Sequence, residues 1–247
     1  MNAPAPVVAI TGATGDVGSA TARAFADAGY RVVAGYRSDG DAADRLVASL
    51  PGTGHRAVHV DVTDPPSLDG LRERLSSEVG SLDVLVNNAG VTRYVPHDDL
   101  DALDDALFDR IFATNVRGAF AATRAVLPLL RADGGGLVVH VSSIAAQSGR
   151  GSNVAYCASK AALDSMTRSL GRALAPGVRV VSVAPGLIDG PYADALDADF
   201  VDAQRRDTPL GRLATSADVA AAIVSVARDL TFSTGCVVPV DGGRPLG

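Results

Sequence analysis

A chain of 247 residues with 47% hydrophobic residues can form one large α/β domain and lacks the composition of a disordered protein. Its net charge of −6 argues against a nucleic-acid partner, because phosphate groups are bound by basic patches. The chain has only two cysteines and no apolar run of membrane-spanning length, so we expect no disulfide framework, no membrane partner and a cytoplasmic location.

Short runs of β-branched residues alternate with Ala-, Leu- and Arg-rich stretches along the whole chain. The runs predict strands at residues 7–10, 31–35, 57–60, 84–87, 137–141, 178–183 and 237–240. The stretches between them predict helices at 18–28, 42–50, 67–77, 105–130, 154–173 and 216–229. Apolar strands separated by helices indicate a parallel sheet with helices on both faces. We therefore predict a doubly wound α/β fold with seven parallel strands in a single domain, residues 1–247, in which residues 190–210 are the least regular part.

A glycine-rich turn follows the first predicted strand and leads into the first predicted helix. Glycines at such a turn let the backbone approach a pyrophosphate, which then lies at the helix N-terminus. The spacing is G-x-x-G-x-x-G, and its place in the first strand–helix unit favours a nucleotide site over a simple tight turn. The candidate cofactor-binding residues of this turn are Gly12, Thr14, Gly15, Asp16, Val17 and Gly18.

The end of the second predicted strand bears on which dinucleotide is bound. A site for NAD places a carboxylate there, which accepts hydrogen bonds from the ribose 2′-hydroxyl. This chain has Tyr36 at that position, and the guanidinium of Arg37 and the hydroxyl of Ser38 suit a 2′-phosphate. NADP(H) is therefore favoured over NAD(H), although Asp39 offers a carboxylate that could engage a ribose instead.

Polar motifs also follow the later strands, at the edge where ligands bind in an open α/β sheet. In chain order they are Asp61-Val62, Asn87-Asn88-Ala89-Gly90, Ser142-Ser143 and Pro185-Gly186. Asn115 lies inside the longest predicted helix, although asparagine is an indifferent helix former. We therefore expect Asn115 to be a buried polar group with specific partners.

One lysine stands among the 22 basic residues, and this residue, Lys160, follows Tyr156 by four positions. On a helix this spacing puts both side chains on one face. An ammonium group beside a phenol favours the phenolate, so we expect the pKa of Tyr156 to be lowered toward neutral pH.

Together these motifs resemble the short-chain dehydrogenase/reductase family, in its compact single-domain branch that includes 3-oxoacyl-carrier-protein reductases. The family pattern is an ordered set: a glycine turn, an Asp after the third strand, N-N-A-G, a helical Asn, a Ser, Y-x-x-x-K and a P-G turn. All members of the set occur here in that order, between Val7 and about Gly243. The resemblance implies a Rossmann-type fold and an NADP(H)-dependent ketoreductase that interconverts a ketone and a secondary alcohol.

The resemblance also implies roles for single residues. Tyr156 is the proton donor to the carbonyl oxygen in reduction, or the base in oxidation. Lys160 lowers the pKa of Tyr156 and hydrogen-bonds the nicotinamide ribose. Ser143, selected over Ser142 by its offset of 13 residues from Tyr156, hydrogen-bonds the substrate oxygen. Asn115 holds a water that links Lys160 to solvent. The other cofactor-binding residues so implied are Asp61, Val62, Asn88, Ala89, Gly90, Pro185, Gly186 and Ile188.

Two positions depart from the family pattern. Compact members usually carry T-G-x-x-x-G-x-G, whereas here the middle glycine has moved to Gly15 and Asp16 stands in its place. This spacing resembles the extended branch of the family, which includes epimerases and dehydratases. A carboxylate near the pyrophosphate would repel it, so we expect Asp16 to turn outward or to cap the helix. Gly190 stands where the family commonly has a threonine that touches the carboxamide, and we expect backbone groups at Ile188 to take over that contact.

The substrate is predicted only by class. The candidate substrate residues are Ser143, Tyr156, Tyr94, Gln147 and Tyr192. They suggest a mid-sized, partly apolar carbonyl compound or its alcohol, such as a 3-oxoacyl thioester, a polyketide-like ketone or a cyclic ketone. The four histidines show no metal-ligand spacing, so no metal site is predicted. By resemblance we expect a homo-oligomer, a tetramer or dimer, joined through the helices predicted at 105–130 and 154–173.

Two other functions stay open. A non-redox NAD(P)-binding lyase or epimerase is suggested by the glycine spacing, but the extended branch has a larger C-terminal substrate region than this chain offers. An NADP-binding regulatory protein would have no need of the complete catalytic set.

Overall fold

The protein, described by a computed structural model for residues 4–244, is built on one sheet of seven parallel strands. The strands are β1 (Val7–Ile10), β2 (Arg31–Tyr36), β3 (Arg56–His59), β4 (Val84–Asn87), β5 (Gly136–Val141), β6 (Val178–Pro185) and β7 (Val237–Val240). Their order is β3-β2-β1-β4-β5-β6-β7, so the direction of winding reverses between β1 and β4. The predicted doubly wound, seven-stranded parallel sheet is confirmed, and ligands of such sheets bind beside the reversal.

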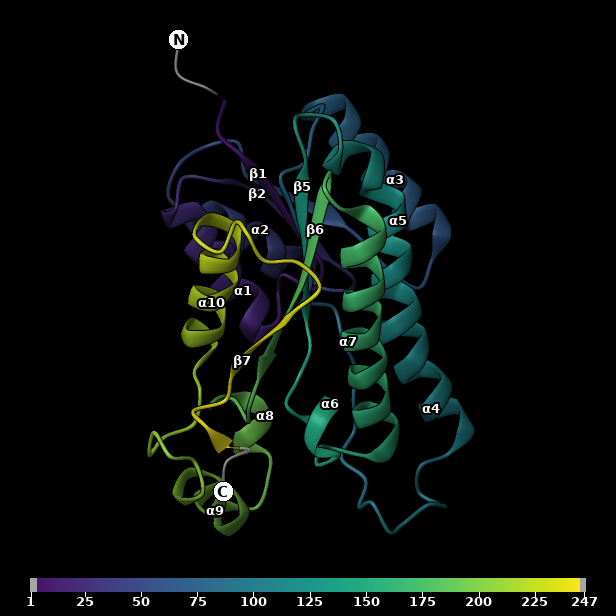
Figure 1. Cartoon of the computed structure of the whole chain (residues 1–247), viewed down its shortest axis with the longest axis vertical. Helices are drawn as coiled ribbons and strands as arrows, with labels where there is room; N and C mark the ends of the chain where they lie inside the picture. The colour runs from purple at the N-terminus through teal and green to yellow at the C-terminus, as the bar shows by residue number, and fades with distance from the viewer. Residues whose placement is uncertain (1–3, 245–247) are drawn as a thin grey trace.

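Helices cover both faces of the sheet (Figure 1). One layer consists of α1 (Asp16–Asp27), α2 (Gly40–Ser49) and α10 (Ser216–Arg228), and the other of α3 (Pro65–Glu78), α5 (Ala119–Leu130) and α7 (Val154–Leu174). Successive side chains of a strand point to opposite faces. On β1, Val8 and Ile10 accordingly pack in the core cluster of α1 and α10, whereas Val7 and Ala9 pack in the cluster of α3 and α5. No helix among residues 4–244 has both the length and the apolar character needed to cross a bilayer.

Side-chain caps fix where several helices begin. Asp64, Asp104 and Asn153 each accept a hydrogen bond from the backbone amide three residues further on, at 3.1, 2.7 and 2.7 Å. Such caps satisfy amides that lack an intrahelical partner. The cap at Asp64, followed by Pro65 in the first turn, starts α3 two residues before the predicted position.

The structure differs from the prediction in three regions. The helix predicted at 105–130 consists of α4 (Asp105–Phe112), a π-helical turn η1 (Ala113–Gly118) and α5. Residues 190–210, predicted to be irregular, contain α8 (Pro191–Asp194) and α9 (Ala198–Arg206), and α6 (Ala145–Ser148) follows β5. These helices are short and begin at turn signals, such as the cap at Asp197, and not in a long apolar repeat.

A titratable residue lies in the centre of the sheet. His140 on β5 is fully buried, with Nδ1 2.8 Å from the hydroxyl of Thr167. Within residues 4–244 its Nε2 atom has no hydrogen-bond partner. Burial, assisted by the positive charge of Lys160, lowers the pKa of His140 from 6.5 to about 3. The folded protein therefore holds this imidazole in its neutral form.

This burial predicts acid sensitivity. Between about pH 6.5 and about pH 3 the unfolded chain binds a proton at His140 that the folded chain does not bind. The free energy of unfolding should therefore fall as the pH is lowered through this window, by up to ~1.4 kcal/mol per pH unit. Urea unfolding at a series of pH values should show a shallower dependence in His140→Gln, and the unchanged wild-type dependence in the exposed-residue control His97→Gln. Equal slopes in His140→Gln and wild type would contradict this assignment.

Candidate active site

The sequence motifs gather at the carboxyl edge of the sheet. The segments that follow β1, β2, β3, β4, β5 and β6 all begin there, and α6, α8 and α9 lie at the same end of the molecule (Figure 1). Every residue predicted to bind cofactor or substrate belongs to one of these segments, to the start of α7 or to η1.

The glycine turn after β1 is shaped to receive an anion. Gly12 has a φ of 66°, which favours glycine, and a Cβ atom on Gly18 would lie 2.3 Å from the carbonyl oxygen of Gly12. Gly15 is the N-cap residue of α1, and no side chain caps this helix. The first-turn amides of α1, flanked by the partly exposed Thr14 and Val17, are therefore available to a ligand. This arrangement fits the diphosphate of a dinucleotide.

The segment after β4 braces this turn. The hydroxyl of Thr11 accepts hydrogen bonds from the backbone amides of Asn88 and Ala89, both at 3.1 Å. The side-chain amide of Asn88 donates to the carbonyl oxygens of Thr11 and Gly12, at 3.1 and 2.9 Å. Thr11 was not among the predicted site residues, and its position directly before Gly12 at a strand end is the signal that could have identified it.

Two exposed polar side chains lie at the end of β2, where the family resemblance places the adenosine ribose. Arg37 and Ser38 are exposed. Asp39 accepts a hydrogen bond from the amide of Ala42 at 2.8 Å and is the N-cap of α2. One oxygen of its carboxylate is thus engaged in capping, and Arg37 and Ser38 are the exposed basic and hydroxyl side chains beside it. These two residues fit a 2′-phosphate.

Asp61 and Val62, which follow β3, differ in which of their groups can face a ligand. Hydrogen bonds from the hydroxyl and amide of Thr63, assisted by the charge of Arg37, lower the pKa of Asp61. The side chain of Val62 is buried, and a Cβ atom on Gly118 of η1 would lie 2.6 Å from its Cγ2 atom. Only the backbone of Val62 can therefore face a ligand.

Lys160 lies at the bottom of the site, on α7. Its side chain is buried, and Nζ donates a hydrogen bond to the carbonyl oxygen of Val141 at 2.7 Å. The same nitrogen is 5.6 Å from the ring centroid of Tyr156. Burial lowers the pKa of Lys160 to about 8, and the negative charge of Asp164 opposes this effect. The ammonium form therefore persists at neutral pH.

Tyr156 has a raised pKa, contrary to the sequence-based prediction. Burial raises it to about 12, and a hydrogen bond with Ser143 opposes the rise. The expected lowering by Lys160 is wrong for this arrangement, because burial dominates the pKa of Tyr156 and the ammonium group donates its hydrogen bond to the carbonyl oxygen of Val141. A raised pKa keeps Tyr156 protonated near neutral pH, which is the form that gives a proton to a carbonyl oxygen.

The two serines after β5 have separate environments. Ser143 is partly exposed, lies close enough to Tyr156 to affect the pKa of that residue, and accepts a hydrogen bond from the amide of Ala145 at 3.2 Å. Ser142 is buried, and its hydroxyl donates to the carbonyl oxygen of Lys160 at 3.4 Å. The structure thus brings Ser143, and not Ser142, next to Tyr156.

Asn115 is a bracing residue in this geometry. It is buried within η1, and its Oδ1 atom accepts from the amide of Val91 at 2.8 Å. Its side-chain nitrogen donates to the carbonyl oxygen of Val91 at 3.1 Å and to the hydroxyl of Ser159 at 3.2 Å. A Cβ atom on Gly90 would lie 3.4 Å from Asn115 Oδ1 and 3.9 Å from Lys160 Nζ. Both side-chain hydrogens of Asn115 are engaged by protein groups, so the predicted water would have to be held through other atoms.

Tyr192, Ser152 and Tyr94 lie near Tyr156, on the side of the site where we expect the substrate. Burial raises the pKa of Tyr192 on α8, the hydroxyl of Ser152 opposes this rise, and nearby Tyr94 adds to it. Tyr94 and Tyr192 are 57% and 43% exposed, so both rings can contact a ligand. Ser152 was missed in the sequence because nothing marks it there. Gln147 is exposed on α6, and no side-chain contact joins it to this group in the described chain.

The segment after β6 lies at the carboxyl edge of the sheet, on the side where we expect the cofactor. Beyond Pro185, the last residue of β6, the amide of Gly186 donates to the carbonyl oxygen of Val240 at 3.1 Å. Ile188 forms a parallel bridge with Ala214 and packs against the core. Asp16 does not cap α1 and has turned outward to the hydroxyl of Ser216, which is one of its two predicted orientations.

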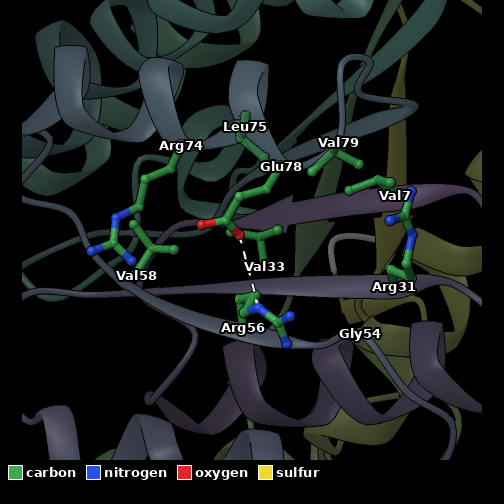
Figure 2. A pocket seen from close by; sticks show the side chains of 10 residues that line it. All are labelled: Val7, Arg31, Val33, Gly54, Arg56, Val58, Arg74, Leu75, Glu78 and Val79. Atoms are coloured by element: carbon green, nitrogen blue, oxygen red, sulfur yellow. Dashed lines mark ion pairs between the residues drawn. The ribbon is translucent and has the colours of Figure 1, made fainter.

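A cavity of roughly 370 Å³ lies away from this site (Figure 2). It is lined by the first residues of β1, β2 and β3 and by the last turn of α3. Arg56 there pairs with Glu78 at 3.8 Å, and basic residues are favoured at the C-terminal end of a helix. Arg56 and Glu78 thus have a structural role in pairing with each other, and none of the site residues lines this cavity. Residues 4–244 contain no group of three or more His, Cys, Asp or Glu side chains arranged to hold a metal ion.

Comparison with known proteins gives consistent matches over nearly the whole chain. The family model described as enoyl-(acyl carrier protein) reductase matches residues 12–244. A granaticin polyketide synthase ketoacyl reductase from Streptomyces violaceoruber is 38% identical over 244 residues, which cover 98% of this chain and 97% of the relative. The cis-4-hydroxycyclohexanecarboxylate dehydrogenase of Sinomonas cyclohexanicum is 39% identical, covering 96% and 95%. The crystal structure of a short-chain dehydrogenase/reductase from Burkholderia xenovorans matches with a TM-score of 0.90 at 33% identity, over 100% of both chains.

Proposed function

The chain belongs to the short-chain dehydrogenase/reductase family of oxidoreductases, and from this premise we propose that it is an NADP(H)-dependent reductase of ketones with Tyr156 as the acid. One observation carries the proposal: Ser143, Tyr156 and Lys160 converge at the sheet edge that also presents the uncapped glycine turn. A regulatory dinucleotide-binding protein does not require this convergence.

The chemistry of the chain's own residues follows from their environments. When bound, a nicotinamide cofactor supplies the hydride, and the protein supplies geometry and charge. Ser143 and Tyr156 donate hydrogen bonds to the carbonyl oxygen, which polarises the carbonyl group. Tyr156 then transfers its proton to this oxygen as negative charge develops on it. A phenol with a pKa of about 12 remains protonated until that moment and still gives its proton to the far more basic alkoxide.

Lys160 compensates the charge that Tyr156 acquires. After proton transfer the phenolate lies in a buried site, where an uncompensated charge is costly. Lys160 is the nearby ammonium group, and Asp164, itself buried, keeps it in the charged form. The same Lys160 nitrogen lies near Gly90, in the segment after β4 to which we assign the cofactor.

The preference for NADP(H) gives a direct prediction at Arg37. Arg37→Ala should raise the Kd of NADPH by about 10- to 100-fold, because charged hydrogen bonds to a phosphate are lost, and leave the Kd of NADH within about twofold. Fluorescence titration of both reduced dinucleotides measures this, with the exposed Arg72→Ala as the control that should change neither. Tighter binding of NADH than NADPH by the wild type would contradict the assignment.

For the substrate we propose a polyketide-like or cyclic ketone. This class is supported by the half-exposed rings of Tyr94 and Tyr192 beside Tyr156, and by relatives named for ketoacyl and hydroxycyclohexane substrates. The test is consumption of NADPH over a panel of cyclic ketones, bicyclic ketones and 3-oxoacyl thioesters, with identification of the alcohol formed. Tight NADPH binding without turnover would favour a regulatory protein, and conversion without NADPH consumption would favour a lyase or epimerase.

We further propose a homo-oligomer joined through α4, α5 and α7, and a reducing, cytoplasmic location. Phe108 on α4 and Phe120 on α5 are 39% and 42% exposed, which supports a contact surface on these helices. Cys157 and Cys236 are both free thiols, which supports the location.

A further inference from the structure

The two departures from the family pattern meet in space. Asp16 begins α1, Gly190 follows β6, and Ser216 begins α10. The hydroxyl of Ser216 donates a hydrogen bond to the Oδ2 atom of Asp16. A Cβ atom on Gly190 would lie 2.8 Å from the same oxygen. Three segments that are distant in the sequence therefore converge on one carboxylate at the mouth of the glycine turn.

This contact decides what the N-terminus of α1 can bind. A carboxylate in the first turn of a helix is attracted to the positive end of the helix dipole and competes with an external anion for the same field. No side chain caps α1, so its first-turn amides are free. Ser216 is itself buried, on a helix that packs against α1, and therefore holds the carboxylate in a fixed place away from these amides.

Gly190 provides the room that this orientation requires. A Cβ atom 2.8 Å from Asp16 Oδ2 would force this carboxylate to shift from its position on Ser216, and threonine would add two more atoms. Nor can the segment easily move away, because the amide of Asp189 donates to the carbonyl oxygen of Ala214 at 2.8 Å. Glycine at 190 is thus a consequence of aspartate at 16.

We propose that Ser216 is a positioning residue for the Asp16 carboxylate: it holds this carboxylate off the α1 amides, which stay free for the dinucleotide diphosphate, and Gly190 leaves room for this orientation. The inference rests on the proposed cofactor site. It predicts that the role of Ser216 in cofactor binding depends on the charge at position 16, and that the cost of a side chain at 190 depends on the carboxylate itself.

A double-mutant cycle on the full chain tests whether Ser216 acts through the negative charge of Asp16. In the wild-type background, Ser216→Ala should raise the Kd of both NADPH and NADH by about tenfold, because the released carboxylate competes for the amides. In the Asp16→Asn background, which keeps the side-chain shape without the charge, the same change should alter Kd less than about twofold. An equal loss in both backgrounds would overturn the proposal, since Ser216 would then act only through the structure of α10.

The contact between position 190 and the Asp16 carboxylate is tested by unfolding measurements without any cofactor. Gly190→Ala should shift the urea midpoint of the wild type to lower concentration by more than it shifts that of Asp16→Gly, and any backbone strain at position 190 cancels in the comparison. Equal shifts would overturn the role of Gly190. A wild type that binds neither dinucleotide would contradict the proposed function and with it the positioning role, whereas the urea comparison decides the Asp16–Gly190 contact separately.

Discussion

Replacement of Tyr156 by phenylalanine is expected to lower kcat for ketone reduction by about 10²- to 10⁴-fold, the range supplied by a positioned general acid. The phenol lies near Ser143, and burial keeps it protonated by raising its pKa. Phenylalanine preserves the ring and removes only the proton donor. The measurement is steady-state oxidation of NADPH in the presence of a ketone that the wild type reduces.

Two controls separate the loss of an acid from a loss of structure. The Kd of NADPH and the thermal midpoint should stay close to wild type in Tyr156→Phe, since the ring itself is kept. Tyr94→Phe, which removes a hydroxyl from the exposed rim, should alter KM more than kcat. Turnover in Tyr156→Phe within about tenfold of the wild type would remove Tyr156 from the acid role.

Replacement of Lys160 by arginine is expected to lower kcat by about 10²- to 10³-fold, the cost of losing one preorganised charge at a reacting centre. The ammonium group is buried and donates to the carbonyl of Val141 at 2.7 Å, where a wide guanidinium cannot take the same position. The charge is kept but displaced. Arg172→Lys, at an exposed position on the same helix, is the matched control and should leave kcat unchanged.

The pH dependence gives this variant a second readout. Because burial lowers the pKa of Lys160 to about 8, the wild type should lose reductase activity as the pH rises above about 8 and the ammonium group is deprotonated. The guanidinium of Lys160→Arg does not titrate in this range, so the low residual activity should show no such decline. Full activity in Lys160→Arg, or an unchanged alkaline limb, would contradict the role of Lys160.

Much of the fold could be predicted because apolar runs report burial directly. The runs at Val7–Ile10, Val84–Asn87 and Val237–Val240 are strands with the predicted bounds. In a parallel sheet all strands end at the same edge, so motifs distant in the sequence were expected to meet there, and Ser143 and Tyr156 do so.

Other features of the fold and of the site depend on contacts between distant residues, which no local sequence pattern encodes. The π-helical turn at Asn115 is stabilised by hydrogen bonds to Val91 and Ser159. The direction of the Tyr156 pKa shift depends on how deeply α7 buries the phenol, which outweighs the spacing to Lys160. The partner of Asp16 lies 200 residues further along the chain, and a turn motif cannot reveal it.

The most direct measurement follows the hydride itself. NADPH that carries deuterium at the transferable position of its nicotinamide ring is incubated with the protein and a cyclic ketone, and the product is analysed by mass spectrometry and NMR. We expect one deuterium at the carbinol carbon of the alcohol for each NADPH consumed, and almost none formed by Tyr156→Phe in the same time. Product that forms without deuterium, or at equal rates in the two proteins, would contradict ketone reduction with Tyr156 as the acid.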